Sequence, residues 1–277
     1  AAQGIASGNY DQTLSLSGPA EVQTVAGAFN DMAKQVKTSQ QAQRDFVANV
    51  SHELKTPLTS IQGFAQAILD GAAESPDALR RSATIIFDEA DRMRRLVEGL
   101  LDLARLDVGQ SALVRGPVDL AALLRSVAEK LSLRAGEKDV TLRQEVPPLP
   151  WIVGDADRLA QVFTNLIDNA LKHTPAGGTV TLAANRVASG VEITVTDTGP
   201  GIPGEDLSRI FERFYQVDKS RKAATGRGAG LGLAITREII GAHGGKIRAE
   251  SVVGLGTKFV VSLPAAQPDD STVARKR

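Results

Sequence analysis

One short segment gathers side chains that could do chemistry. In FVANVSHELKTPLTSIQGF, residues 46–64, His52 is followed by Glu53, Thr56 and Pro57. On a helix, Thr56 shares a face with His52, and Pro57 should bend the helix because it lacks an N–H and clashes with the carbonyl of Glu53. The zinc motif HExxH is excluded, since the position four after His52 is a threonine. From these residues alone, an exposed helical histidine without chemistry is the alternative.

Two glycine-rich segments in the second half could shape a nucleotide pocket. In DTGPGIP, residues 197–203, Gly199 and Gly201 let the backbone turn sharply and approach a ligand. The Asp197 carboxylate can accept a hydrogen bond from an exocyclic amine such as that of adenine. GRGAGLGL, residues 226–233, precedes a predicted helix, where N–H groups and the helix dipole favour phosphate. Taken singly, each segment also fits a plain turn or a flexible linker.

A third segment, QVFTNLIDNALKHT at residues 161–174, has a polar and an apolar side when placed on a helix. The polar residues are Asn165, Asn169, Lys172 and His173, and the residues predicted to face the core are Phe163, Leu166, Ile167 and Leu171. An asparagine carbonyl suits Mg²⁺ and a lysine suits phosphate. Because asparagine is unfavourable inside a helix, two on one face indicate a ligand or a buried polar network.

The first group of elements that must position these residues is helical. Apolar residues recur at three- and four-residue steps over residues 20–36, 40–69 and 75–107, and Gly71 is a predicted helix stop. Two long helices with a short connection form a hairpin whose apolar stripe needs a partner. We therefore predict a homodimer that closes a four-helix bundle. The alternative is a hairpin that packs on the rest of its own chain.

Beyond this hairpin, helical and strand patterns alternate. Helices are predicted over residues 119–134, 159–172 and 231–242, and strands over residues 140–146, 151–153, 179–187, 191–196, 246–253 and 257–263. Helices on one side of a mostly antiparallel sheet give an α+β two-layer sandwich. The fold class is therefore multi-domain, with an all-α hairpin followed by this sandwich.

Composition narrows the function classes. The 277 residues carry 32 basic and 32 acidic side chains, which argues against a nucleic-acid surface. The absence of cysteine excludes disulfides, thiolate metal sites and cysteine nucleophiles. No apolar run approaches the ~20 residues that a membrane span needs. Because the chain starts at Ala1 and not at Met, we expect a fragment whose membrane or sensory part is absent.

Taken together, the motifs resemble the sensor histidine kinases of two-component systems. DTGPGIP, RIFERFYQVD, GRGAGLGL and NLIDNALKHT have the order and spacing of their ATP-binding domain, whose fold is shared with gyrase B, Hsp90 and MutL, and SHELKTPL resembles their phosphoacceptor box. The start of the chain is similar to part of a HAMP signalling module, with a plain amphipathic linker as the alternative. The implied domains are a partial HAMP helix (1–39), a dimerisation and phosphotransfer hairpin (40–110), an ATP-binding domain (111–266) and a loose tail (267–277).

The resemblance implies roles for individual residues. His52 would attack the γ-phosphate of ATP, Glu53 would accept the proton of the other ring nitrogen, and Thr56 would position a water for the reverse, phosphatase activity. Asn169 would coordinate Mg²⁺ and Asp197 would bind adenine. The other implied residues are Asn165, Lys172 and His173 at the phosphates, Gly199 and Gly201 at adenine, Gly228, Gly230, Leu231 and Gly232 on the phosphate side, Phe211 and Phe214 as anchors of a lid over residues 204–229, and Gly256 and Thr257 in a final glycine box.

The resemblance also implies an overall activity. A dimeric kinase would autophosphorylate on its histidine from Mg-ATP and pass the phosphoryl group to an aspartate of a response regulator receiver domain. The chain would be the cytoplasmic portion of a protein anchored in the inner membrane. A hinge over residues 108–117 would let the ATP-binding domain reach His52, whereas His243 is predicted to act only as a helix cap.

Two other functions fit part of the pattern. An ATP-gated clamp of the gyrase and Hsp90 type would bind and hydrolyse ATP without forming a phosphoprotein. A nucleotide-sensing pseudokinase scaffold would bind ATP and dimerise without either product.

Overall fold

The computed structural model describes residues 13–107, 113–217 and 230–265. The chain consists of two compact units, Ala1–Met93 and Arg94–Arg277. Among the described residues, none of the helices combines the length and the apolar character that a membrane span requires.

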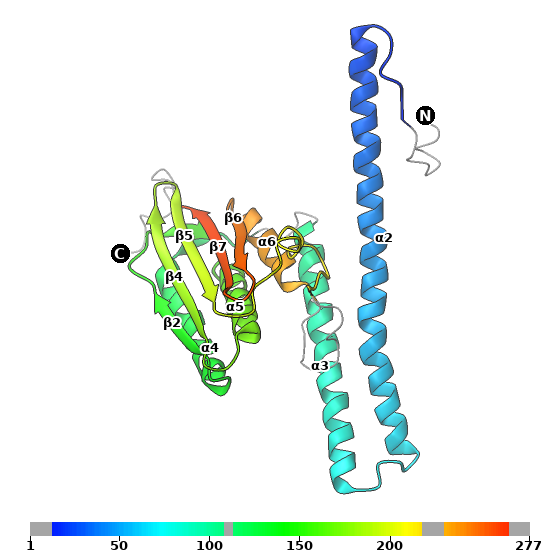
Figure 1. Cartoon of the computed structure of the whole chain (residues 1–277), viewed down its shortest axis with the longest axis vertical. Helices are drawn as coiled ribbons and strands as arrows, with labels where there is room; N and C mark the ends of the chain where they lie inside the picture. The colour runs from blue at the N-terminus through cyan, green and yellow to red at the C-terminus, as the bar shows by residue number, and fades with distance from the viewer. Residues whose placement is uncertain (1–12, 108–112, 218–229, 266–277) are drawn as a thin grey trace. The chain divides into compact units, whose positions relative to one another are not determined.

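A helical hairpin makes up most of the first unit, and its second helix continues past Met93. Helix α2 (Ala20–Leu69) runs for 50 residues, and helix α3 (Pro76–Asp107) starts after a short loop (Figure 1). The sequence predicted two helices in place of α2, and this prediction was wrong. Residues 37–39, between the two predicted helices, are Lys, Thr and Ser, so they contain neither glycine nor proline to end the helix.

The hairpin loop confirms the predicted stop and start signals. Gly71 has a φ of +73°, the left-handed conformation that commonly follows a helix. Ser75 Oγ accepts a hydrogen bond from the N–H of Ala78 at 3.1 Å and so caps α3. Pro76 occupies the first helical position, where its missing N–H costs nothing.

The second unit contains a five-stranded mixed sheet in the order β2-β4-β5-β7-β6, in which only the β2–β4 pair is parallel. Its strands are β2 (Thr141–Glu145), β4 (Thr179–Val187), β5 (Gly190–Asp197), β6 (Lys246–Val252) and β7 (Gly256–Pro264). Strands β1 (Gly116–Val118) and β3 (Ile152–Gly154) form a separate antiparallel pair. All of the predicted strands are present.

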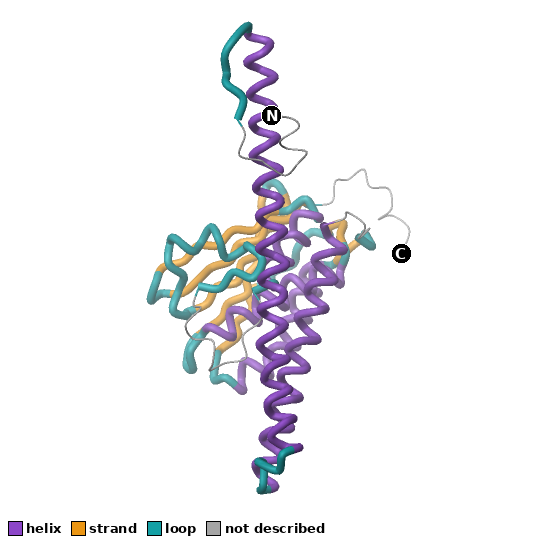
Figure 2. The backbone as a smooth tube through the Cα atoms, turned by 90° about the vertical axis from the view of Figure 1, so that its right-hand side faces the viewer, coloured by secondary structure: helices purple, strands orange, loops and turns teal. Residues whose placement is uncertain are grey.

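Three helices cover one face of this sheet. Helices α4 (Leu120–Glu137), α5 (Ala156–His173) and α6 (Gly232–Ala242) contact one another in that order and also contact the strands, so they form a single layer (Figures 1 and 2). The predicted core side of α5 is fully buried. Strands β4 and β5 alternate buried and less buried residues over most of their lengths, as strands covered on one face do. The predicted two-layer α+β sandwich is confirmed.

Candidate functional site

Helix α5 presents the polar face that the sequence predicted. Asn165, Asn169 and Lys172 are half-buried, and His173 at the end of the helix is exposed. Asn165 faces the start of α6, because a Cβ added to Gly232 would lie 3.9 Å from its side-chain amide. The fold thus brings the asparagine face of α5 to the first turn of α6.

Asp197, at the end of β5, is buried and held by two backbone donors. Its Oδ1 accepts hydrogen bonds from the N–H of Gly199 at 2.8 Å and of Thr257 at 3.2 Å. Burial raises the pKa of the Asp197 carboxyl above its usual value, and these two N–H groups oppose the rise. Among the described residues only Oδ1 has a hydrogen-bond partner, so Oδ2 is the oxygen left to accept a bond from a ligand.

The backbone around Asp197 is too close for side chains. A Cβ on Gly256, whose φ is +124°, would lie 1.9 Å from the carbonyl oxygen of Asp197. A Cβ on Gly201, with a φ of +72°, would lie 2.3 Å from the carbonyl oxygen of Val252. These contacts place the loop after β5 directly against the β6–β7 hairpin.

Sequence reasoning missed Ser251, which ties these segments together. Its hydroxyl donates to the carbonyl of Gly256 at 2.8 Å, accepts from the N–H of Ile202 at 2.8 Å and lies 3.0 Å from the hydroxyl of Thr257. The only signal for it is its position in β6, where it pairs with Thr257, and that pairing requires the register of the hairpin to be known.

The predicted lid over residues 204–229 is described only up to residue 217, because residues 218–229, and therefore Gly228, lie outside the described residues. Its first anchor, Phe211, is buried and packs edge to face on Phe259, with ring centroids 6.3 Å apart. The second, Phe214, has a φ of +63° and donates its N–H to the carbonyl of Gly230 at 3.0 Å. This hydrogen bond therefore joins Phe214 to Gly230, the first described residue after 229.

The first turn of α6 has no side-chain cap. Leu231 occupies the N-cap position, is buried and makes no side-chain capping hydrogen bond, and Gly232 is the first helical residue. The N–H groups of an uncapped first turn suit an anion. They lie next to Asn165.

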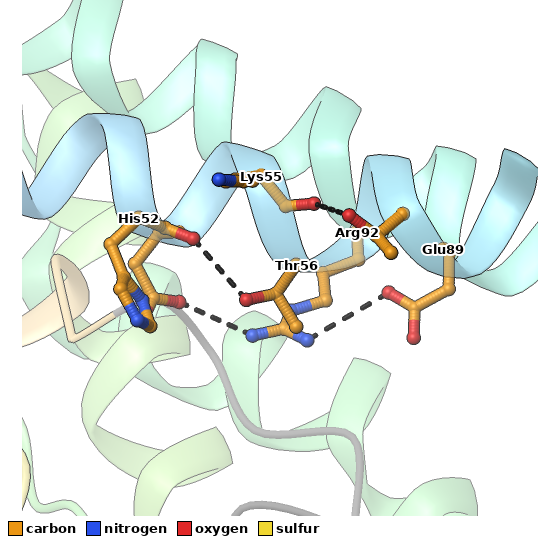
Figure 3. A network of polar contacts seen from close by, with 7 residues as sticks. His52, Lys55, Thr56, Glu89 and Arg92 are labelled. Atoms are coloured by element: carbon orange, nitrogen blue, oxygen red, sulfur yellow. Dashed lines mark hydrogen bonds and ion pairs between the residues drawn. The ribbon is translucent and has the colours of Figure 1, made fainter.

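In the first unit, His52 and Thr56 are both exposed and lie one turn apart on α2. The Thr56 hydroxyl donates to the carbonyl of His52 at 3.3 Å, as Figure 3 shows. Pro57, which follows, is buried and lies inside the continuous helix.

Glu53, which the sequence paired with His52, contacts a different residue. Its Oε2 accepts a hydrogen bond from Nη2 of Arg92 on α3 at 3.2 Å. The other nitrogen of that guanidinium, Nη1, lies 3.7 Å from Oε2 of Glu89 (Figure 3). Sequence reasoning missed Arg92, because only the packed hairpin brings it into contact with Glu53, 39 positions away. It also missed Glu89, which lies one turn before Arg92 on α3.

Three known domain families match successive parts of the chain. Residues 1–38 match the HAMP domain, and residues 42–109 match the His Kinase A (phospho-acceptor) domain. Residues 154–267 match the histidine kinase-, DNA gyrase B-, and HSP90-like ATPase. His52 falls in the second match, and Asp197 and the polar face of α5 fall in the third.

Whole proteins and solved structures agree with these matches. The sensor protein SrrB of Staphylococcus aureus is 38% identical over 224 residues, which cover 81% of this chain and 38% of SrrB. A crystal structure of full-length ShkA in complex with AMPPNP is 35% identical with a TM-score of 0.59, covering 80% of this chain and 47% of ShkA. A crystal structure of histidine kinase ThkA with response regulator protein TrrA is 25% identical with a TM-score of 0.66, covering 85% of this chain and 66% of that one. The chain thus spans well under half of its curated relative.

Proposed function

We propose, from the premise that this chain belongs to the sensor histidine kinases, that it phosphorylates His52 with ATP. The observation that best supports this is the combination of an exposed His52 in the matched phospho-acceptor region with a buried Asp197 in the matched ATPase region, held through Oδ1 by two backbone N–H groups. A ring nitrogen of His52 attacks the γ-phosphorus, an N–P bond forms, and the bond from phosphorus to the bridging oxygen breaks as ADP leaves. Glu53 accepts the proton of the other ring nitrogen.

The adenine end of the nucleotide lies at the loop after β5. The exocyclic amine of adenine donates to Oδ2 of Asp197, and this donor geometry discriminates against bases that lack the amine. Gly199 and Gly201 let the backbone lie close to the base.

The phosphate end lies between α5 and the first turn of α6. Asn165, Lys172 and His173 contact the phosphates together with backbone N–H groups near Leu231 and Gly232, and Gly228 and Gly230 belong to the same phosphate side of the site. Asn169 fits Mg²⁺, because its amide is a hard oxygen ligand on the half-buried face that carries Asn165. When bound, Mg²⁺ supplies neutralising charge at the phosphates.

The phosphoryl group then passes from His52 to an aspartate on the receiver domain of a response regulator. The structure of ThkA with a response regulator supports this class of partner.

Thr56 supports a second, phosphatase activity, because its hydroxyl lies on the face of His52 and can position a water. Thr56→Ala should slow regulator dephosphorylation and spare autophosphorylation, and equal loss of both would reject this division of roles.

In the whole protein, the α2–α3 hairpin forms a homodimer. A HAMP domain ahead of the hairpin supports a membrane-anchored sensor of which this chain is the cytoplasmic portion.

Incubation with γ-labelled ATP tests the kinase. The expected product is label on the protein that is stable to base, lost in acid and absent from His52→Gln. Release of ADP without labelled protein would favour an ATP-gated clamp, and nucleotide binding with neither product would favour a scaffold.

A further inference from the structure

Arg92 lies between two carboxylates that come from different helices. It donates to Glu53 on α2 and approaches Glu89, one turn earlier on α3 (Figure 3). The side chains of Arg92, Glu53 and Glu89 are 32%, 18% and 26% exposed, so the three charges are partly removed from water. In such surroundings each contact has more weight than a surface ion pair has.

The two carboxylates are not equally satisfied. Glu53 has a hydrogen bond from Arg92, whereas Oε2 of Glu89 is buried and has no hydrogen-bond partner among the described residues. Its separation of 3.7 Å from Arg92 is longer than a hydrogen bond. A buried acceptor without a partner costs free energy. A small movement of the guanidinium toward Glu89 would relieve that cost and weaken the bond to Glu53.

The Glu53 carboxylate is held by Arg92 on the facing helix. Adjacent residues on a helix do not face each other, so the direction that brings Glu53 to α3 differs from the one that would bring it to the imidazole. To accept the proton of His52, Glu53 must leave Arg92.

Pro57 gives the α2 backbone a place to move. Because Pro57 has no N–H, the carbonyl of Glu53 lacks its usual helical hydrogen bond at the residue that Arg92 holds. A bend of α2 at this place would change the distance from Glu53 to Arg92.

We propose that Arg92 is a positioning residue that controls Glu53. Bound to Glu53, it keeps the carboxylate away from His52. When it passes to Glu89, Glu53 is released and takes the imidazole proton during phosphorylation. This inference rests on the proposed kinase function, and it makes the Glu53–Arg92–Glu89 cluster a two-state element that a signal along α2 can bias.

Two variants should change the autophosphorylation rate in opposite directions. Glu89→Gln weakens the competing acceptor and should slow the initial rate at saturating ATP, whereas the paired Arg92→Gln/Glu89→Gln variant frees Glu53 without leaving Glu89 as a second carboxylate that has lost its cation, and should accelerate it. Each change should be about two- to fivefold, as for an ion pair of modest strength, with the KM for ATP unchanged. In a Glu53→Gln background the paired change should give no acceleration. Arg94→Gln, which removes an exposed ion pair with Glu98 on the same helix, is the matched control and should match the parent rate.

A second readout does not depend on activity. ¹⁵N NMR of the His52 imidazole, assigned by comparison with His52→Gln, should show one dominant tautomer in the paired variant, because the released Glu53 holds one ring N–H. Suppose that the wild-type protein takes up label, while both variants keep the wild-type rate and the wild-type imidazole spectrum. This result would overturn the role of Arg92 and leave the kinase function intact. Absence of label from wild type would instead overturn the kinase function, and the NMR comparison would still decide whether Arg92 restrains Glu53.

Discussion

Asp197 combines two opposing properties. Its burial raises the pKa of the carboxyl, so ionisation of this residue weakens the folded state. For an acid whose pKa is raised on folding, this cost is absent well below the ordinary pKa of 3.8, grows as the pH rises from there to the raised folded value, and persists at neutral pH. The buried carboxylate therefore lowers the stability of the ligand-free protein, and the oxygen that it provides is the acceptor that we propose for adenine.

Asp197→Asn should weaken ATP binding without lowering the thermal stability of the protein. The amide oxygen can still accept from Gly199 and Thr257, so unfolding at pH 7 without nucleotide should occur at an equal or higher temperature than in wild type. The new amide nitrogen would face the adenine amine, donor against donor, and ATP affinity should fall about ten- to a hundredfold. Inosine triphosphate, which offers a carbonyl at that position, should then bind better than ATP. Retention of the wild-type preference for ATP, measured by calorimetry, would show that Oδ2 does not bind the base.

His243 makes contacts that its position in the sequence does not indicate. It is the predicted cap of α6, but its ring is also buried. Nε2 accepts from the N–H of Asp155 at 2.9 Å, and Nδ1 lies 2.8 Å from the carbonyl of Ile239, so Nδ1 carries the proton. Asp155 in turn accepts from the N–H of Val114 at 3.0 Å. The imidazole thus connects the end of α6 to the start of α5.

His243→Ala should destabilise the second unit by about 2–4 kcal/mol, because it leaves a cavity and an unpaired buried N–H. His243→Gln, which can supply both an acceptor and a donor, should recover part of that loss. Denaturant unfolding gives the comparison. Equal stability of the alanine variant and wild type would mean that the two hydrogen bonds contribute nothing net.

At the scale of elements, the β6–β7 hairpin determines where Thr257 meets Asp197. Two of its glycines have positive φ, Gly254 in the turn and Gly256 at the start of β7. A Cβ on Gly254 would meet nothing within 4 Å, whereas one on Gly256 would collide with the carbonyl of Asp197. The pair therefore distinguishes backbone strain alone from strain combined with a steric clash.

Gly254→Ala should lower the free energy of unfolding by about 1 kcal/mol, the cost of a left-handed alanine. Gly256→Ala should cost at least about 3 kcal/mol and also weaken ATP binding, because the hairpin must move away from Asp197. Thermal unfolding with and without nucleotide checks both. Similar losses in the two variants would contradict the assigned close approach.

The periodic patterns predicted the elements well, for identifiable reasons. The alternating strands and the apolar face of α5 are local signals, and Gly71 and Ser75-Pro76 mark the hairpin loop because caps depend on neighbouring residues. Contacts between distant residues were not predictable in this way. Arg92 and Ser251 act through a packed hairpin and a strand register, neither of which leaves a pattern along the chain.

At the scale of the whole molecule, one chain leaves part of the hairpin's apolar stripe uncovered. Leu58 on α2 and Leu79 on α3 belong to the predicted stripe and are 45% and 46% exposed. Burying such side chains against a second copy would stabilise each by roughly 1–2 kcal/mol.

The paired variant Leu58→Glu/Leu79→Glu should shift the protein from dimer to monomer in analytical ultracentrifugation. Leu133→Glu, at an exposed position on α4, is the control and should leave the dimer intact. A dimer that tolerates both charges at its proposed interface would place the contact elsewhere.

The most direct test of the whole account is the chemical state of His52 after reaction. Protein incubated with Mg-ATP and never acidified should yield, by mass spectrometry, a His52 peptide carrying one phosphoryl group. The same peptide from Asp197→Asn should be largely unmodified at ATP concentrations near the wild-type KM. Turnover of ATP to ADP by wild type with an unmodified His52 peptide throughout would contradict the account.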